Sequence, residues 1–385
     1  MDIFETSFFA PGITSMLAAV LLVTTKGWHG KYSIDGTVGV QKFHKAPTPR
    51  IGGIAIAAGL AAALLLSQGS ASPLLGQLLI AGLPAFAAGL AEDFTKKVGV
   101  RTRLAATMSS ALLAFFLTGY TLTHLELPGI DPWFAFLPLS LAFTIFAVAG
   151  VANAVNIIDG FNGLAGGTLV ICFSALGMIA AQAGDFQLAQ LCAITAVVVV
   201  GFLVVNFPFG KLFLGDSGAY LLGFLLAWTA VMLPMRNPVV SVWAPLLVCG
   251  YPVIETIFSI LRRLMSSCHP GHADCSHCHS LIKIGIVRRH FSGLPQFMRN
   301  SLVSPFCWSF ALVPAGLGVA FSGRTELLAA SLVGCFALYS MFYFFLVWKL
   351  HRAASQSGVT FDGKPSSSTH RQAEQPAPAL TEKLL

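Results

Sequence analysis

The sequence predicts an all-α membrane protein that crosses the bilayer many times. Apolar residues make up 55% of the 385-residue chain and charged residues only 10%, whereas a soluble domain is about one-quarter charged. The apolar residues form long runs, and a spanning helix needs about 20 mostly apolar residues. Lys and Arg fall almost entirely in alternate connections between these runs. Composition, run length and charge placement therefore all indicate a polytopic helical protein.

Eleven apolar runs are candidate spanning helices, and the run at 219–233 is the weakest because only about fifteen of its positions are clearly apolar. We expect residues 1–350 to form one integral membrane domain. The remainder, 351–385, is rich in Ser, Pro, Gln and Ala and is predicted to be a disordered cytoplasmic tail. The runs lie at residues 6–25, 51–67, 74–90, 104–119, 134–151, 164–182, 188–205, 219–233, 239–261, 304–321 and 327–349.

The placement of Lys and Arg predicts the orientation of the chain. When the connections are taken alternately, one set holds 21 of the 23 basic residues, and the other holds only Arg236 and Arg324. Cytoplasmic connections carry the excess of Lys and Arg, so the N-terminus is expected in the periplasm and the C-terminus in the cytoplasm. The N-terminus lacks the basic region and cleavage site of a signal peptide, so the first run is interpreted as a span.

Polar residues are costly at the centre of a bilayer, by about 2.5–3.5 kcal/mol for Asp, Lys or Arg. The unusual ones in this chain gather at the predicted cytoplasmic ends of the runs. The first cluster follows the third run and contains Glu92, Asp93 and Lys96. Two adjacent carboxylates could hold a divalent cation or accept a proton, and the two lysines beside them, Lys96 and Lys97, could pair with phosphate. The structural alternative is a charged cap that ends a spanning helix.

The second cluster lies between the fifth and sixth runs and contains Asn153, Asn156, Asp159 and Asn162. The first three of these residues are three apart, so in a helix they share one broad face. Glycines around them would let the backbone approach a ligand closely. A polar contact between helices, or a plain turn, is the structural alternative.

The third cluster spans residues 206–218 and includes Asn206, Phe213 and Asp216. A lone Asp flanked by glycines, at the point where a new span opens, suits a hard metal ion. The N-terminus of a helix also favours anions and phosphate. The structural alternative is that Asp216 or Ser217 simply caps the helix that begins near residue 219.

The fourth cluster lies in the long connection at 262–303 and combines Cys, His and basic residues. Binding of phosphate and sugar is the preferred interpretation. Zinc held by Cys275 and Cys278 with flanking histidines is one alternative, and a loop that is basic only because it is cytoplasmic is another. The candidate residues in this connection are His277, His279, Arg288 and Arg289.

Glu255 stands apart from these clusters, because it lies inside the ninth apolar run. An ionisable side chain within the membrane is by default a candidate for a functional role. An internal acid that only holds helices together through hydrogen bonds is an equal alternative.

Five stretches together resemble the polyprenyl-phosphate N-acetylhexosamine-1-phosphate transferase family, the MraY/WecA-type enzymes. They are His44–Gly53, Glu92–Lys96, Asn153–Gly167, Asn206–Gly218 and His277–His279. They occur in the order found in the family and cover the chain from residue 44 to about 290. Eleven spans with the N-terminus outside match the WecA-like branch. Each stretch is weak by itself, but five in register make the resemblance specific.

The resemblance implies an enzyme of the bacterial inner membrane whose active site is on the cytoplasmic side. It would transfer an N-acetylhexosamine-1-phosphate from a UDP-sugar to undecaprenyl phosphate, with release of UMP. The product would initiate a lipid-linked cell-surface polysaccharide such as O-antigen. Mg²⁺ would be required, with Mn²⁺ as an alternative. The implied partners are UDP-N-acetylhexosamine, undecaprenyl phosphate and membrane lipid, not nucleic acid, and a homodimer is left open.

The resemblance also implies roles for individual residues. Asp93 looks like the second Asp of the family's DDxxD/K motif, a candidate base or phosphate-positioning acid, and Lys96 looks like its closing Lys. Glu92 stands where the family usually has Asp, and its extra methylene ranks it below Asp93. Asn156 and Asp216 resemble the metal ligands. The uridine pocket is matched by Asp159, Asn162, Asn206 and Phe213, and Asp159 is also kept as a catalytic residue. His277 and His279 would lie near the diphosphate and sugar, and the further substrate contacts would be Lys45, Asn153, Arg288 and Arg289.

Two rival functions remain open at this point. The muramyl-pentapeptide branch carries an extended histidine-rich run where this chain has only His277–His279. Phospho-N-acetylmuramoyl-pentapeptide transferase is therefore the alternative and not the preferred function. A membrane transporter is the rival from another class. Transporters place polar sites near the midplane of repeated halves, whereas the polar clusters here lie in connections and no repeat is visible.

Overall fold

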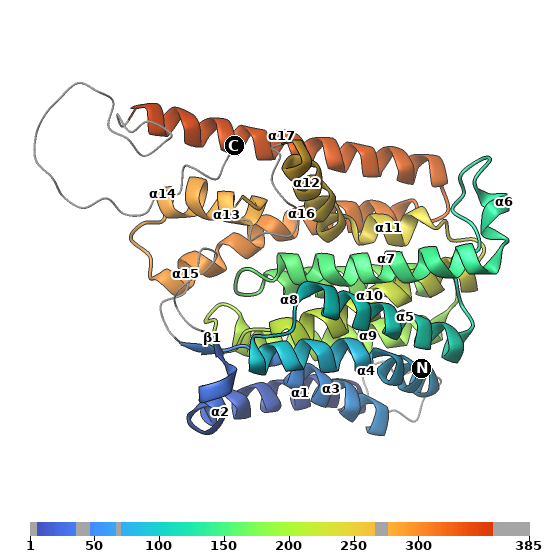
Figure 1. Ribbon diagram of the computed structural model, residues 1–385, viewed down its shortest axis with the longest axis horizontal. Helices are drawn as coiled ribbons and strands as arrows, with labels where there is room; N and C mark the ends of the chain where they lie inside the picture. The colour runs from blue at the N-terminus through green and yellow to red at the C-terminus, as the bar shows by residue number, and fades with distance from the viewer. Residues whose placement is uncertain (1–5, 36–46, 67–70, 266–275, 357–385) are drawn as a thin grey trace, which may run out of the picture.

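A computed structural model describes residues 6–35, 47–66, 71–265 and 276–356, and this part of the chain is almost entirely helical (Figure 1). Its long helices run side by side, along the horizontal direction of the figure. The elements are α1 (Thr6–Thr24), α2 (Lys26–Ser33), β1 (Ile34–Asp35), β2 (Thr48–Pro49), α3 (Gly52–Leu66), α4 (Ala71–Thr95), α5 (Val100–Thr118), α6 (Asp131–Phe134), α7 (Leu137–Ile158), α8 (Leu164–Gln182), α9 (Phe186–Asn206), α10 (Gly215–Arg236), α11 (Trp243–Val248), α12 (Gly250–Met265), α13 (Cys278–Ile282), the π-helical turn η1 (Lys283–Val287), α14 (Arg288–His290), α15 (Gln296–Ser301), α16 (Val303–Ala320) and α17 (Thr325–Gln356).

Eight of the described helices are long and apolar enough to cross a membrane. The number becomes nine if α1 and α2, which meet at an angle of 85°, are counted as one bent span. A further apolar helix, α3, has only 15 residues. The protein is therefore a mostly helical, multi-pass membrane protein, as predicted. The count of eleven spans and the orientation of the termini stay predictions.

Each of the eleven predicted runs coincides with helix, but two expectations need correction. The run at 239–261 is not one helix: α11 ends at Val248, and the amphipathic α12 crosses the direction of the long helices (Figure 1). Pro252, in the first turn of α12, suits a helix start and not a helix interior. The predicted tail begins too early, because α17 continues to Gln356. The rest of that tail, 357–385, lies outside the described residues.

The predicted all-α class holds apart from one short β pair. In this pair β1 runs antiparallel to β2, with Ile34 opposite Pro49. The pair is only two residues long on each side, so it does not change the helical class. Its importance is that it places the next residue, Arg50, at the end of the helical bundle.

The weakest of the predicted spans is the centre of the molecule. Helix α10 is buried along nearly its whole length, and it packs against α3, α4 and α7. A helix surrounded by protein does not need a uniformly lipophilic surface, which explains its modest hydropathy. Small residues let helices approach closely inside a membrane. At Gly223 of α10, a Cβ atom would lie only 2.7 Å from the Cα atom of Ala152 in α7.

The contact between α1 and α9 gives a first testable prediction. A methyl group at Gly201 would collide with the backbone carbonyl oxygen of Gly12, which cannot move aside. We expect Gly201→Ala to lower the free energy of unfolding by roughly 1–3 kcal/mol, the usual cost of overpacking. Thermal unfolding in detergent measures the change. Gly150→Ala is the matched control, because nothing lies within 4 Å of its added methyl; equal stability of the two variants would contradict the close contact.

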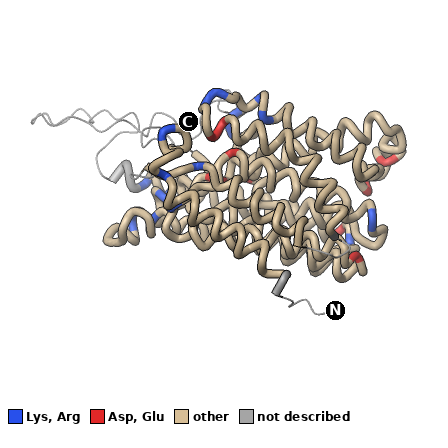
Figure 2. Tube along the Cα trace, turned by 90° about the horizontal axis from the view of Figure 1, so that it is seen from below, with Lys and Arg blue, Asp and Glu red and all other residues tan. Residues whose placement is uncertain are grey.

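The two ends of the bundle differ in charge. Figure 2 shows most of the Lys and Arg residues at one end, the end at which α4 and α7 finish and α10 begins. At the opposite end, Arg236 is held by Asp185 through two contacts of 2.6 and 2.9 Å. This distribution agrees with the asymmetry found in the sequence.

Candidate active site

The site is assembled where two distant segments of backbone pair. The amide of Phe213 donates to the carbonyl oxygen of Pro49 over 2.9 Å, and the amides of Gly52 and Gly53 donate back to Phe213 and Leu214 over 2.9 Å. Gly53 permits this approach, since a Cβ atom there would collide with the backbone at Gly218. The pairing fixes the start of α3 against the start of α10, at the basic end of the bundle.

Asp93 lies at this junction and is completely buried. Its Oδ1 accepts the amide of Asp216 at 2.9 Å, and its Oδ2 accepts the amide of Ser217 at 2.9 Å and the Ser217 hydroxyl at 2.6 Å. Arg50 adds a contact of 3.4 Å from Nε to Oδ1. The first amides of a helix have no partner within the helix, and a negative charge near them is favourable. Asp93 therefore caps α10 from another helix.

The cap of α10 differs from the one considered in the sequence analysis. The sequence is also compatible with Asp216 or Ser217 as the cap of its own helix. In the structure the N-cap position of α10 is Leu214 and carries no side-chain cap, and both residues lie inside the first turn. The side chain of Asp216 is consequently available for other partners.

Asp216 is bound by two arginines. Its Oδ1 lies 2.6 Å from Nη2 of Arg50, and its Oδ2 faces the guanidinium group of Arg103. The Arg103 guanidinium also lies over the ring of Tyr220, 5.6 Å from its centre. Asp216 is 4% exposed, so its charge is balanced mainly by these two cations. Arg50 joins it to Asp93, and together the four residues form one compact ionic network.

Asp159 completes the network as the residue that ends α7. Loss of water around its carboxyl group raises the pKa of Asp159 to about 7. The positive charge of Arg50 and the backbone amide of Gly215 lower this pKa, whereas the negative charge of Asp93 raises it further. A carboxyl group with a pKa near neutrality can exchange protons under physiological conditions. Three acids and two arginines from five parts of the chain thus share one site.

The predicted face of α7 lies beside this network. Asn153 and Asn156 are in the last turns of α7, as expected from their spacing. Oδ1 of Asn153 accepts the Tyr220 hydroxyl at 3.1 Å, and α7 packs along α10. Asn156 is half-buried, and its carbonyl oxygen accepts the amide of Asp159 at 3.3 Å. The face therefore looks toward the first turns of α10.

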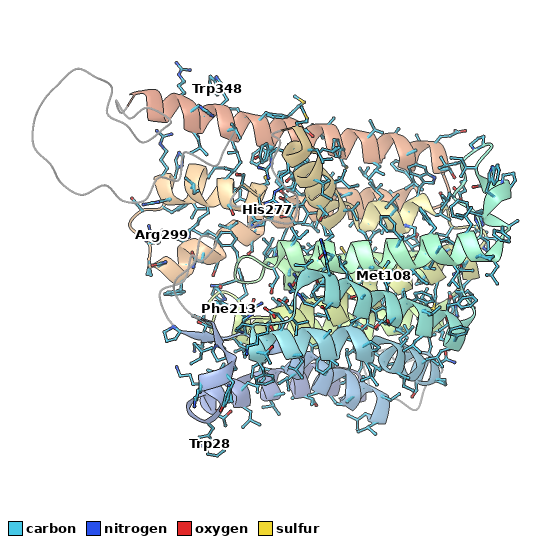
Figure 3. The ribbon with its side chains drawn as sticks, in the orientation of Figure 1. Trp28, Met108, Phe213, His277, Arg299 and Trp348 are labelled. Atoms are coloured by element: carbon cyan, nitrogen blue, oxygen red, sulfur yellow. The ribbon has the colours of Figure 1, made fainter. Side chains whose placement is uncertain are left out.

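The residues predicted to bind uridine are partly engaged in holding their own loops. Oδ1 of Asn206 accepts the amide of Gly163 at 2.6 Å, and its Nδ2 donates to the carbonyl oxygen of Leu212 at 2.8 Å. Nδ2 of Asn162 donates to the carbonyl oxygen of Pro208 at 3.2 Å. Phe213 is half-buried and lies beside the junction (Figure 3). The two asparagines thus fix the loops around this aromatic ring.

Glu92 and Lys96 fit the structural alternative better than a direct role. Oε2 of Glu92 accepts the amide of Val98 at 2.7 Å. Nζ of Lys96 donates to the carbonyl oxygen of Asp93. Both contacts close the end of α4.

The two predicted histidines form a stacked pair. The rings of His277 and His279 are 5.2 Å apart and nearly parallel, at 12°. His279 also meets Phe161 edge to face, with 5.6 Å between ring centres. The pair therefore lies against the turn that follows Asp159. Cys278, between the two, is buried, while Cys275, its suggested partner in a zinc site, lies outside the described residues.

Two of the remaining predicted substrate contacts lie on the surface. Arg288 and Arg289 are exposed on the short helix α14. Lys45 lies outside the described residues. Two arginines were missed instead: Arg50 stands within the quoted stretch His44–Gly53, and Arg103 was counted only as a charge that orients the protein. Both arginines directly precede an apolar run, at 51–67 and at 104–119, and this position was the available signal.

The donor set suits a magnesium ion that substrate helps to bind. Carboxylate and amide oxygens such as those of Asp216 and Asn156 are hard ligands, and Mg²⁺ commonly takes one or two carboxylates together with substrate phosphates. Within the described residues, no three His, Cys, Asp or Glu side chains converge as a complete metal site. Both Asp216 oxygens face arginines, so binding of a metal there requires the guanidinium groups to shift.

Comparison with known proteins adds independent findings. Residues 75–234 match the family model for glycosyl transferase family 4, a range that contains Asp93, Asp159 and Asp216. An undecaprenyl-phosphate alpha-N-acetylglucosaminyl 1-phosphate transferase from Yersinia pestis is 29% identical over 274 residues, 69% of this chain and 72% of the relative. A probable undecaprenyl-phosphate N-acetylglucosaminyl 1-phosphate transferase from Bacillus subtilis is 26% identical over 65% of this chain and 70% of its own length. A decaprenyl-phosphate N-acetylglucosaminephosphotransferase from Mycolicibacterium smegmatis is 27% identical over 72% of this chain and 76% of its own length.

Proposed function

We propose that the chain is a sugar-phosphate transferase of glycosyl transferase family 4, the family whose model matches residues 75–234. It would move N-acetylglucosamine-1-phosphate from UDP-N-acetylglucosamine to undecaprenyl phosphate and release UMP. The observation that carries the proposal is the network of Asp93, Asp159 and Asp216 with Arg50 and Arg103, at the basic end of an apolar bundle. The sugar and the lipid of the proposal are those after which the relatives are named.

The network suits a reaction between two phosphates. An oxygen of the lipid phosphate would attack the β-phosphorus of the nucleotide sugar, and the bond from that phosphorus to UMP would break. Both reactants are anions, so their approach needs cationic groups. Arg50 and Arg103 would be free to contact phosphate if Asp216 held a metal ion in their place. Asp159, with its raised pKa, is the acid best suited to hold or release a proton beside them.

Magnesium is the proposed cofactor, with Asn156 and Asp216 as its protein ligands and Mn²⁺ as a substitute. When bound, the ion would neutralise the diphosphate and so stabilise the departing UMP. The uridine would lie near Phe213, with Asn162 and Asn206 fixing the loops around it. Eleven spans, a periplasmic N-terminus and a site on the cytoplasmic side of the bacterial inner membrane remain part of the proposal.

The rival functions are less well supported. The relatives named above are N-acetylglucosaminyl transferases, which favours them over the muramyl-pentapeptide enzyme. A transporter would place its polar residues near the midplane, whereas the network here lies at helix ends. The polysaccharide that receives the product, O-antigen or another, is left open, as is a homodimer.

The experiment is a measurement of UMP release by purified protein in detergent. With undecaprenyl phosphate, Mg²⁺ and UDP-N-acetylglucosamine, we expect UMP and the lipid-linked sugar diphosphate in equal amounts. Chelation with EDTA should stop the reaction, and added Mg²⁺ or Mn²⁺ should restore it. UDP-N-acetylgalactosamine and UDP-glucose serve as comparison substrates. If none of the three UDP-sugars yields UMP, the proposed function is refuted. If the protein is fully active in EDTA, the requirement for a metal ion is refuted.

A further inference from the structure

Glu255 is a buried acid that the proposed reaction does not use. It lies on α12 and has no exposed surface. Its Oε1 lies 3.0 Å from Nδ1 of His277 and accepts the amide of Cys278 at 3.2 Å. Its Oε2 accepts the hydroxyl of Tyr339, from α17, at 2.6 Å. A buried carboxylate is costly unless it is hydrogen-bonded in this way, and here its bonds connect three separate elements.

The contact with His277 determines which ring nitrogen carries a proton. A carboxylate accepts hydrogen bonds, so it holds the proton on Nδ1 and leaves Nε2 to point elsewhere. The hydroxyl of Ser259, one turn further along α12, lies 3.2 Å from the same Nδ1. The imidazole side chain is 13% exposed. Glu255 therefore lies where it can hold both the tautomer and the direction of the His277 ring.

The effect of Glu255 extends beyond one ring. Its bond to the amide of Cys278 holds the first turn of α13, which carries His279. His277 stacks on His279. The Nε2 atom of His279 lies so near the backbone of Gly160 that an added Cβ would be 3.0 Å from it. A continuous line of contacts therefore runs from α12 to the turn beside Asp159.

We infer that Glu255 is a positioning residue that holds His277 in its Nδ1–H form and sets the histidine pair beside the turn at Asp159–Phe161. The inference rests on the proposed function for its effect on turnover. In this inference α12 is the support that holds His277 and the start of α13 in position beside the active site. The purely structural alternative, an acid that only joins helices, predicts no special dependence on His277.

The tautomer can be tested without any assay of activity. Protein labelled with ¹⁵N-histidine is measured by NMR, and the signals of His277 are assigned from their loss in His277→Gln. We expect Nδ1 of His277 to be protonated in the wild-type protein. Glu255→Leu should shift the ring toward the Nε2–H form. An unprotonated Nδ1 in the wild-type protein would overturn the inference, whether or not the protein releases UMP.

The kinetic test compares variants that disturb the same carboxylate in different ways. Glu255→Leu should lower kcat by about 10- to 100-fold, the usual effect of losing such a support, with a smaller change in KM. Glu255→Gln should recover most of the loss, because its amide oxygen still accepts from Nδ1. Tyr339→Phe removes a hydrogen bond from Oε2 but leaves His277 in place, so it is the matched control.

Coupling to His277 separates the two roles. In a His277→Ala background, Glu255→Leu should lower kcat by clearly less than it does in the wild-type background, because residues that act as one unit are not additive. Only the support of His279 through the amide of Cys278 then remains to be lost. Equal losses in Tyr339→Phe and Glu255→Leu, or a full additional loss in the His277→Ala background, would overturn the inference. If the wild-type protein releases no UMP, the proposed function fails, and the NMR measurement still decides the tautomer.

Discussion

Asp93→Asn is expected to abolish turnover and also to destabilise the folded protein. Asparagine replaces one acceptor oxygen by an NH₂ group, which would face the amide or hydroxyl of Ser217 or the guanidinium group of Arg50. Leaving a buried donor without an acceptor costs roughly 1–3 kcal/mol. The first turn of α10, and with it Asp216, would lose its cap. Thermal unfolding and UMP release, measured on the same sample, test both effects.

Ser217→Ala is the control for this prediction, because it removes only one donor and leaves the carboxylate and its other bonds intact. We expect this variant to lose about 1 kcal/mol of stability and to keep most of its turnover. Loss of turnover in Asp93→Asn with unchanged stability would contradict the cap and favour Asp93 as a base.

A covalent role for Asp93 can be examined in the same experiments. If the lipid phosphate attacks directly, radiolabelled UDP-N-acetylglucosamine without lipid should leave no label on the protein. Complete burial and four contacts to donors make this carboxylate a poor nucleophile. Stoichiometric labelling would refute direct attack.

Asp216→Asn is expected to have an effect of similar size on turnover through a different cause. The amide cannot balance the charges of Arg50 and Arg103, and it is a weaker ligand for Mg²⁺ than a carboxylate. We expect UMP release to fall by at least about 100-fold, equivalent to about 2.7 kcal/mol in the barrier. A titration with Mg²⁺ measures whether the remaining activity needs more metal.

Asp185→Asn provides the matched control for Asp216→Asn. Asp185 is also paired with an arginine, but this pair lies at the opposite end of the bundle, where α9 begins and α10 ends. Its loss should leave turnover unchanged. Wild-type activity in Asp216→Asn would refute both the metal assignment and the importance of the ionic network.

Much of this architecture could be predicted from local properties of the chain. Apolar runs marked every long helix, and the placement of Lys and Arg singled out the end of the bundle at which the site is found. The spacing of Asn153 and Asn156 correctly predicted that both lie on a helix, in its last turns, whereas Asp159 is the residue that ends this helix. These predictions succeed because transfer from water to lipid depends on residues that are near one another in sequence.

Contacts between distant segments decided the rest. Asp93 and Ser217 are far apart in the chain, and nothing near Asp93 indicates that its carboxylate caps α10. In the sequence, Arg50 and Arg103 cannot be distinguished by charge from the other basic residues. Only the packing of α3, α5 and α10 places them beside Asp216. The break between α11 and α12 likewise places Glu255 against His277. A hydrogen bond or ion pair depends on distance and direction in space, which hydropathy and spacing along the chain do not contain.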